Sequence, residues 1–506
     1  MNGADTAHLT VSTQGETMKH RMRTAAVIVA AVVTIAACGG SDDDSPSADS
    51  AAVTTAPPVD TVSPTTEPSA DTTGAPATTE EPASDGVRRV PDDYATITEA
   101  VEAAAPGDLV LIAAGTYHEA VNVTTDNVTI RGLDRNEVIL DGEFELDNGI
   151  RVLGASGVVV ENLTTQNYTR NGVFFLETDG YRASYVNAIR NGDYGIYAFD
   201  SVNGTIEHSY GAGSPDAGVY IGQCFPCDSL IDDVLSEHNG LGYSGTNSGG
   251  NLLIVNSTFR NNRAGIVPNS GSYELCYPER QTTIVGNIVH SNNQPDTPAI
   301  DVAILAMGNG ILVPGGIANV IERNIVFDHD KTGIGLVPFL EEGPNDDLPT
   351  EDEWTVDCAT QREQPLADEV PEALLWDSWD NVVVGNHVSD SRVADLGVAG
   401  VGVDTSTLRN CWSGNVFTTS APTGIETLAP CGGTGAGDWT ANALDVLSWL
   451  AEIETRPPSV DYQTAPLPPM PDLPGMEDPE HAPVEPAGPP RRIDLAAIAV
   501  PAAPTG

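Results

Sequence analysis

The residues best suited to chemistry recur at a fixed spacing. Glu177 and Asp200 stand 23 positions apart, and Gln223 follows after another 23. If the chain closes one coil of strands over that distance, the two carboxylates lie about 5 Å apart on neighbouring strands. Like charges so close either raise one pKa or attract a cation. The pair therefore predicts a proton-holding acid or an oxygen site for calcium, the alternative being two solvated turn residues.

Three aromatic residues share this spacing. Phe174, Tyr197 and Tyr220 each stand two positions after a glycine, and strand alternation turns them outward. Aromatic faces pack well against the C–H faces of sugar rings, so the column predicts a carbohydrate-binding platform. The alternative is that a loop covers the column, or that its rings stack only to stabilise the sheet.

Other candidate acid–base groups follow no repeat. His238 precedes Asn239-Gly240, a turn, where it acts either as a proton acceptor or as a hydrogen-bonding corner residue. Three arginines are also candidate bases, and no spacing selects among them: Arg151, Arg182 and Arg190. Cys224-Phe-Pro-Cys227 lacks a second cysteine pair or a suitable histidine pair, so we expect no firm metal site there.

The elements that position these residues repeat as well. Glycines at 149, 172, 195 and 218, each followed by Ile or Val, are 23 residues apart, and short β-branched runs alternate with Asn, Gly and Asp. Neither helical repeats nor leucine-rich repeats fit this pattern. It predicts an all-β fold, a single-stranded right-handed parallel β-helix (solenoid). Asparagines that follow β-branched runs are expected to form one amide ladder at a corner: Asn162, Asn256, Asn287, Asn324, Asn386 and Asn415.

The start of the repeat needs a cover, because an open sheet edge pairs with other chains. Residues 91–104 predict a short amphipathic capping helix, which leads into Asp108–Ile112 and then Gly115-Thr-Tyr-His-Glu119. This opening, followed by Val128-Thr-Ile-Arg-Gly132, resembles the cap and first turns of the pectin lyase-like superfamily, pectin methylesterases in particular. The resemblance covers roughly residues 87 to 420.

The resemblance implies a fold and a class of activity but no site. Many polysaccharide lyases of the superfamily use calcium and a basic residue to draw a proton from a uronic acid ring. The catalytic Gln-Asp-Thr-Leu and Asp-Phe-Ile-Phe-Gly segments of methylesterases do not occur here. We therefore carry over no catalytic residue, and interpret His118 and Glu119 as structural.

The charge of the chain limits which partners it can bind. The 506 residues carry 22 Lys+Arg against 72 Asp+Glu, a net charge of -50, with 50 glycines and 37 prolines. Nucleic-acid binding rests on Lys and Arg that neutralise phosphates, so we expect no nucleic-acid partner. So negative a surface suits a salt-rich exterior, cations such as calcium, or solubility alone.

The N-terminus predicts export and lipid anchoring. Lys19, Arg21 and Arg23 precede an apolar run of twelve residues, and Ile35-Ala-Ala-Cys38-Gly39 resembles a bacterial lipobox. The resemblance implies cleavage before Cys38 and attachment of lipid to its thiol, on the outer side of the cytoplasmic membrane or on the cell surface; an ordinary secretory peptide is the alternative. The membrane is then a partner only through the anchor.

The remaining six cysteines predict up to three disulfides in an oxidising compartment, with Cys411 and Cys431 the best local pair. The expected organisation is a signal peptide (1–37), a disordered Ser/Thr/Pro-rich tether (38–86), the β-helix (87–420), a C-terminal cap or small lobe (421–465) and a Pro-rich tail (466–506). An acidic insertion at about 341–372 interrupts the coil.

Three functions remain open at this point. The first is a cell-envelope-anchored β-helix that binds an extracellular glycan or a partner along one sheet face. The second is a polysaccharide lyase or epimerase acting on an acidic polysaccharide, and the third is a structural envelope scaffold. The fold does not decide among them, or whether the chain is an enzyme at all.

Overall fold

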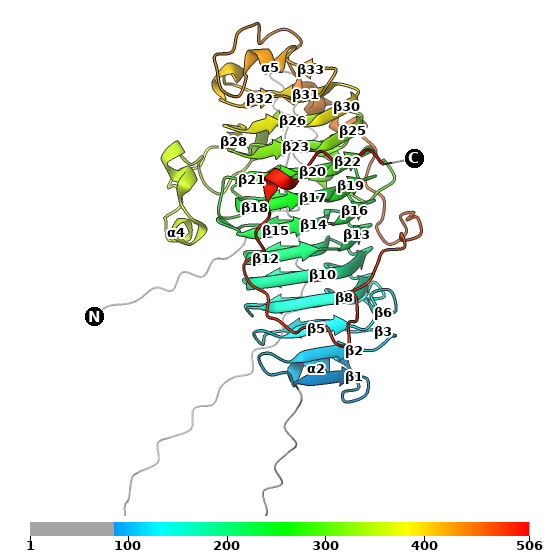
Figure 1. Ribbon diagram of the computed structural model, residues 1–506. Helices are drawn as coiled ribbons and strands as arrows, with labels where there is room; N and C mark the ends of the chain where they lie inside the picture. Colours follow the sequence, from blue (N-terminus) through cyan, green and yellow to red (C-terminus); the bar gives the residue numbers. More distant parts are fainter. Residues whose placement is uncertain (1–85, 505–506) are drawn as a thin grey trace, which may run out of the picture. The chain divides into compact units, whose positions relative to one another are not determined.

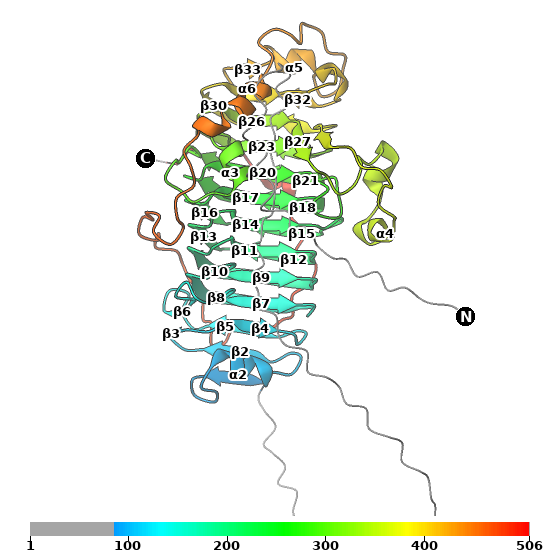
Figure 2. The same ribbon diagram turned by 180° about the vertical axis from the view of Figure 1, so that it is seen from behind.

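The computed structural model describes residues 86–504, and within them the chain winds into a parallel β-helix. Each coil adds a strand in parallel register to the one before it, which forms an 11-stranded sheet and a 20-stranded sheet (Figures 1 and 2). We call them sheet B and sheet A. The predicted signal peptide, Cys38 and nearly all of the predicted tether lie outside the described residues.

Sheet B is the column that faces the viewer in Figure 2. Its strands are β4 (Val121–Val123), β7 (Ile150–Leu153), β9 (Val173–Leu176), β11 (Tyr194–Phe199), β14 (Ala217–Gly222), β17 (Leu241–Thr246), β20 (Ala264–Asn269), β23 (Ile311–Pro314), β26 (Thr332–Val337), β31 (Ala394–Val398) and β33 (Ser420–Ala421).

Sheet A consists of two columns that two long strands join. The first column holds β1 (Val87–Val90), β2 (Leu109–Ile112), β5 (Thr129–Gly132), the long strands β8 (Val158–Gln166) and β10 (Asp179–Ile189), β12 (Val202–Glu207), β15 (Ser229–Asp232), β18 (Gly249–Val255), β21 (Arg280–Val285), β24 (Val320–Glu322), β29 (Val382–Val384) and β32 (Cys411–Ser413). The second holds β3 (Gly115–Tyr117), β6 (Val138–Asp141), the later parts of β8 and β10, β13 (Tyr210–Ala212), β16 (Leu235–Glu237), β19 (Thr258–Arg260), β22 (Ile288–His290), β25 (Ile325–His329) and β30 (His387–Ser391).

Helices are few and short. They are α2 (Ile97–Glu102), α3 (Asp301–Ala306), α4 (Cys358–Arg362), α5 (Ile425–Leu428) and α6 (Val446–Ala451), with 3-10 turns η1 (Glu351–Thr355), η2 (Thr405–Thr407), η3 (Ile453–Thr455) and η4 (Leu495–Ala497). Within residues 86–504, none is long and apolar enough to cross a membrane.

The glycine repeat has a steric cause. A Cβ on Gly149, Gly172 or Gly195 would lie 2.4–2.6 Å from the carbonyl oxygen of the next glycine in the column. No side chain fits at that distance, so these coils need a glycine where they start their strands in sheet B. The residue after each glycine points inward and is completely buried: Ile150, Val173, Ile196 and Val219. The glycines therefore stand one above another, as the 23-residue spacing predicts.

The asparagine prediction is right for four of the six residues. Asn287, Asn324, Asn386 and Asn415 form one ladder, in which each side-chain amide donates to the next at 2.9–3.0 Å. Asn162 and Asn256 are corner residues with left-handed backbone, at φ 57° and 50°. The prediction failed for these two because asparagine suits both the ladder and the left-handed corner.

The capping helix forms where it was expected but is shorter. Thr96 caps the first turn of α2, and the Glu119 carboxylate accepts hydrogen bonds from the backbone of Ile97 and Thr98 at 3.0 and 2.8 Å. Glu119 thus satisfies backbone N–H groups at the helix start that have no partner within the helix. Its role is structural, as interpreted from the sequence.

The C-terminal segment packs along sheet A, as Figure 1 shows in orange to red. Arginines of the β-helix donate to its backbone carbonyls: Arg263 to Pro457 and Pro458, Arg190 to Tyr462 and Ala465, Arg135 to Pro474, Arg131 to Pro479, Ala482 and Pro483, and Arg323 to Leu495 and Ile498. Ile493, Leu495 and Ile498 also pack on an apolar patch of sheet A. The segment therefore covers much of this outer face.

Candidate active site

The outward face of sheet B carries the predicted aromatic column. Phe174 pairs in register with Tyr197, and Tyr197 with Tyr220, so the three lie on adjacent strands β9, β11 and β14. Phe174 and Tyr197 are half-buried, with ring centroids 4.7 Å apart and planes 15° from parallel. Tyr220 is only 1% exposed. Tyr220 therefore does not form part of an exposed sugar-binding platform, because the loop of residues 270–279 covers it, which was the alternative expected from the sequence.

Tyr194 completes the aromatic group and was not foreseen from the sequence. Its ring stacks on Tyr197, with centroids 4.3 Å apart and planes 12° from parallel. Tyr220 meets Tyr197 edge-on at 4.9 Å. Tyr197 thus has a ring neighbour on each side, while its hydroxyl has no hydrogen-bond partner among residues 86–504.

Two carboxyl groups flank Tyr197, each held by one of its neighbours. The Tyr194 hydroxyl hydrogen-bonds Asp216, and the Tyr220 hydroxyl donates to the Glu274 oxygens at 2.8 and 2.7 Å. Burial raises the pKa of Asp216 to about 7, and burial raises the pKa of Glu274 to about 8. Ionising either group takes a charge out of water into a site with little compensation.

The pKa values of the tyrosine hydroxyls are raised as well. Burial and the nearby carboxyl groups raise the pKa of Tyr197 well above 10, so its phenol keeps its proton at neutral pH. Burial also raises the pKa of Asp193, while Arg170, 3.3 Å away, opposes this rise. The site therefore combines a neutral proton donor with carboxyl groups that titrate near neutrality, the range in which general acid–base catalysts work best.

The loop that carries Glu274 is fixed at several points. The Asn247 amide donates to the carbonyls of Gly271 and Glu274 at 2.6 and 2.8 Å, and the Leu275 N–H donates to Gln223 Oε1 at 2.9 Å. The Cys276–Cys358 disulfide ties the loop to the insertion. These contacts determine where Glu274 lies relative to Tyr197.

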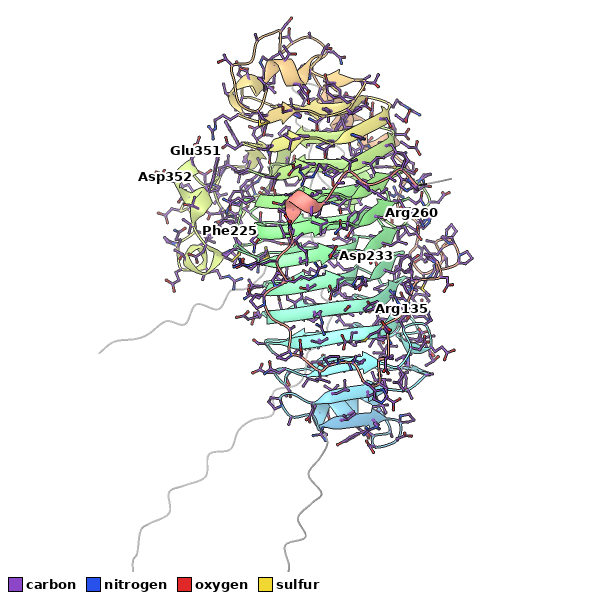
Figure 3. All side chains as sticks on the ribbon, in the orientation of Figure 1. Arg135, Phe225, Asp233, Arg260, Glu351 and Asp352 are labelled. Carbon is purple, nitrogen blue, oxygen red and sulfur yellow. A yellow bond between two sulfur atoms is a disulfide. The ribbon has the colours of Figure 1, made fainter. Side chains whose placement is uncertain are left out.

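Arg280 holds the other side of this loop. It donates to the Cys276 carbonyl at 2.8 Å and to the Val356 carbonyl of the insertion at 2.7 Å. Its guanidinium also lies 3.5 Å from the ring centroid of Phe225, which Figure 3 labels. Because Arg280 is almost fully buried, it serves as an internal brace and has no exposed charge to offer a ligand.

The predicted carboxylate pair lies at a corner of the coil. Glu177, Asp200 and Gln223 all have left-handed backbone, with φ of 52–53°. Glu177 is exposed, and Asp200 forms an ion pair with Arg362 of α4. This partner makes Asp200 a contact point for the insertion and leaves it poorly suited to calcium. Within residues 86–504, no three His, Cys, Asp or Glu side chains gather closely enough to hold a metal ion.

The other predicted acid–base candidates form contacts that stabilise the fold. His238 is a corner residue with φ 60°, and burial beside Arg260 lowers its pKa despite the nearby Glu237. Arg182 pairs with Glu161 at 3.2 Å, and Arg151 donates to Asn122 at 2.9 Å. Arg190 is one of the arginines that bind the C-terminal segment.

All six described cysteines form disulfides. The predicted pair Cys411–Cys431 is bonded, as are Cys224–Cys227 and Cys276–Cys358. The insertion begins and ends in an antiparallel ribbon of β27 (Phe339–Glu342) and β28 (Ala373–Trp376), which sets it apart from the parallel coils.

The Asp216 position was recoverable from the sequence. Asp193 and Asp216 each stand two residues before a glycine of the repeat, 23 positions apart, the spacing that identified the aromatic column. Glu274 was not recoverable, since it lies in a loop without periodicity that a disulfide between residues 82 positions apart holds in place.

Comparison with known proteins agrees with this architecture. The family model described as right handed beta helix region matches residues 171–338. The chain is a right-handed parallel β-helix protein. No curated protein matches the sequence.

Several solved structures are similar at low identity. The A-module of mannuronan C-5 epimerase AlgE4 from Azotobacter vinelandii is 16% identical with a TM-score of 0.39, over 66% of this chain and 92% of that one. Pectate lyase Pel9A is 11% identical with a TM-score of 0.37, over 69% of this chain and 75% of that one. An alginate lyase from Paenibacillus sp. is 14% identical with a TM-score of 0.34, over 65% of this chain and 93% of that one. Values this low say nothing of a shared activity.

Proposed function

We propose that this β-helix protein is a polysaccharide lyase or epimerase that acts on an acidic polysaccharide at the outward face of sheet B. The observation that supports the proposal is the unpaired Tyr197 hydroxyl, whose ring neighbours Tyr194 and Tyr220 hold two carboxyl groups that titrate near neutrality. This group combines the proton donors and acceptors that proton abstraction beside a carboxylate requires.

Each group has a role in the proposed reaction. Asp216, with a pKa of about 7, accepts the proton on the ring carbon beside the sugar carboxylate. Glu274 stays protonated at neutral pH and donates a hydrogen bond to that carboxylate, which stabilises the negative charge that develops. Tyr197 is the proton donor.

The fate of the proton distinguishes the two reactions. In a lyase, the Tyr197 proton passes to the glycosidic oxygen as its bond to the ring breaks, and a carbon–carbon double bond forms in the ring. In an epimerase, Tyr197 instead donates its proton to the same carbon, on the face opposite to the one from which Asp216 removed the first proton. An epimerase therefore needs its donor and acceptor on opposite sides of the sugar, whereas a lyase can use either arrangement.

The charge of the site also fits an anionic substrate. A chain with a net charge of -50 repels a polyanion, yet Glu274, which keeps its proton at neutral pH, adds no charge where the substrate binds. The C-terminal segment covers much of sheet A, whereas Phe174 and Tyr197 on sheet B remain partly exposed. Sheet B is therefore the better candidate surface for a long polymer.

A second candidate function is glycan binding without turnover. The partly exposed aromatic pair Phe174 and Tyr197 supports it: the two rings stack on each other and leave an apolar patch of ring edges on the outer face of sheet B. Binding of this kind needs neither Asp216 nor Glu274, so variants of these two carboxyl groups separate the candidates.

The proposal is tested on alginate and pectate. Lyase activity appears as the ultraviolet absorbance of unsaturated uronates, and epimerase activity as a change in the NMR spectrum of the product. Tyr197→Phe keeps the ring and removes the hydroxyl, while Tyr185→Phe on sheet A is the matched control. We expect turnover that Tyr197→Phe abolishes and Tyr185→Phe leaves unchanged. Binding without turnover would favour the second candidate, and neither binding nor turnover would oppose both.

The lipid anchor at Cys38 remains a proposal from the sequence. A diacylated Cys38 would hold the β-helix on the outer side of the membrane, where extracellular polysaccharide is found. Detergent-phase partitioning of the expressed protein, compared with Cys38→Ala, tests it. Equal partitioning of the two proteins would contradict the anchor.

A further inference from the structure

A cavity lies beside the insertion, and three tryptophans are among the residues that line it. It has a volume of about 400 Å³ and is lined by Trp354, Trp376 and Trp379, with Leu348 and Val403 as exposed residues at its edge. We call it the tryptophan pocket. Its volume is in the range of small-molecule sites, and its lining is predominantly apolar. Nothing in the proposed reaction at Tyr197 uses it.

One charged residue lines this pocket. Asp377 is 8% exposed, and its Oδ1 atom has no hydrogen-bond partner among the described residues. The Val401 backbone hydrogen-bonds the carboxyl group, which leaves Oδ1 unsatisfied. A buried carboxyl oxygen without a partner is unfavourable unless a ligand supplies one.

The remaining lining offers few polar partners. The indole N–H of Trp376 already donates to Glu341 Oε2 at 2.7 Å. Apart from the tryptophans, Asp377 is the only polar side chain among the described residues that line the pocket. A sugar ring would leave most of its hydroxyl groups unpaired there, so the lining favours a compact apolar ligand with one positive centre.

The surroundings are acidic. Figure 3 shows Glu351 and Asp352 on the insertion, where they belong to η1 together with Trp354. The Arg409 guanidinium lies 5.2 Å from the Trp379 ring centroid, but it binds both Asp380 oxygens at 2.7 Å and Glu351 at 3.1 Å. Two carboxylates offset its charge, and the field around the pocket attracts cations.

We propose that the tryptophan pocket binds an organic ammonium group, which lies against the faces of Trp354 and Trp379 and forms an ion pair with Asp377. The two rings are 6.3 Å apart at 43°, and both are half-buried. Aromatic faces attract cations, most strongly in a site from which water is excluded. The site is independent of the proposed polysaccharide reaction.

The test is a calorimetric titration of the full chain with choline and with its neutral isostere 3,3-dimethylbutan-1-ol. These ligands have the same shape and differ in charge. We expect saturable choline binding that is about tenfold or more tighter than binding of the alcohol. Equal binding of the two would overturn the proposal, because it would show an apolar cavity without charge selectivity.

Variants assign the binding to named residues. Asp377→Asn preserves shape and removes the charge, so choline binding should weaken about tenfold. Asp352→Asn removes an exposed carboxylate from the same insertion and should leave binding within about twofold. Trp354→Leu provides a second test, since it lies on the partly exposed wall and should also weaken binding. Choline affinity unchanged in Asp377→Asn and Trp354→Leu, or binding of methyl glycosides with none of choline, would contradict the proposal.

Discussion

Replacing Asp216 with asparagine should remove a defined part of the pH dependence of stability. Burial raises the pKa of Asp216 from its ordinary value of 3.8 to about 7 in the folded chain. Between these values the unfolded chain has released the proton and the folded chain has kept it. The contribution of Asp216 to the free energy of unfolding is therefore fully present below about pH 4, and it is lost as the pH rises towards 7.

The size of this effect follows from the same two values. A difference of about 3 pKa units between 3.8 and about 7, at ~1.4 kcal/mol each, corresponds to about 4 kcal/mol of unfolding free energy. The asparagine in Asp216→Asn cannot ionise. The unfolding free energy of the variant should therefore fall less between these pH values than that of the natural chain, and the difference should be up to about 4 kcal/mol. Glu274 is present in both proteins, but the charge of Asp216 is one cause of its raised pKa, so the measured difference includes this smaller effect on Glu274.

Urea unfolding followed by tryptophan fluorescence measures the difference. Midpoints and slopes are compared at about pH 4 and about pH 8 for the natural chain, Asp216→Asn and the exposed control Asp352→Asn. The control should follow the natural chain. If Asp216→Asn loses as much stability as the natural chain between these pH values, Asp216 ionises in the fold as freely as in water, and its proposed role as a base fails.

Three further outcomes follow from the structure. Turnover should rise with pH through about 7, as Asp216 ionises, and fall through about 8, as Glu274 loses its proton; a flat pH–rate profile would contradict these roles. Replacing both Cys276 and Cys358 with serine should free the loop that carries Glu274. We expect kcat to fall by about 10- to 100-fold with little change in circular dichroism. An unchanged kcat would show that the disulfide does not position the loop. Arg131 is fully buried, 2.6 Å from Glu161, and donates to three carbonyls of the C-terminal segment, so Arg131→Ala should cost about 3–5 kcal/mol in urea unfolding; a loss under about 1 kcal/mol would contradict this brace.

The coil could be predicted from the sequence because its constraint is local and repeats. A glycine is required wherever a Cβ would meet the next carbonyl oxygen, as at 149, 172 and 195, and at 218 a Cβ would meet the Ser236 hydroxyl instead. The inward Ile and Val residues and the outward aromatic residues follow from strand alternation around these glycines. The sequence therefore predicts Phe174, Tyr197 and Tyr220 on adjacent strands, where they lie.

The chemistry of the site depended on contacts that no spacing records. Glu274 reaches Tyr220 from a non-repeating loop, and Arg362 of the insertion binds Asp200. Burial of Glu274 in this loop raises the pKa of its carboxyl group, and the ion pair with Arg362 gives Asp200 a structural role. Coil spacing predicted which side chains share a column but not which loops cover that column.

The most direct test of the proposed site is a crystal structure of Tyr197→Phe with a uronate oligosaccharide. The variant keeps the ring surface and lacks the proposed proton donor, so the substrate should remain intact. We expect a sugar over Phe174 and the substituted ring at position 197, with its carboxylate within hydrogen-bond distance of Glu274. An oligosaccharide bound on sheet A or at the insertion, with sheet B empty, would contradict the account.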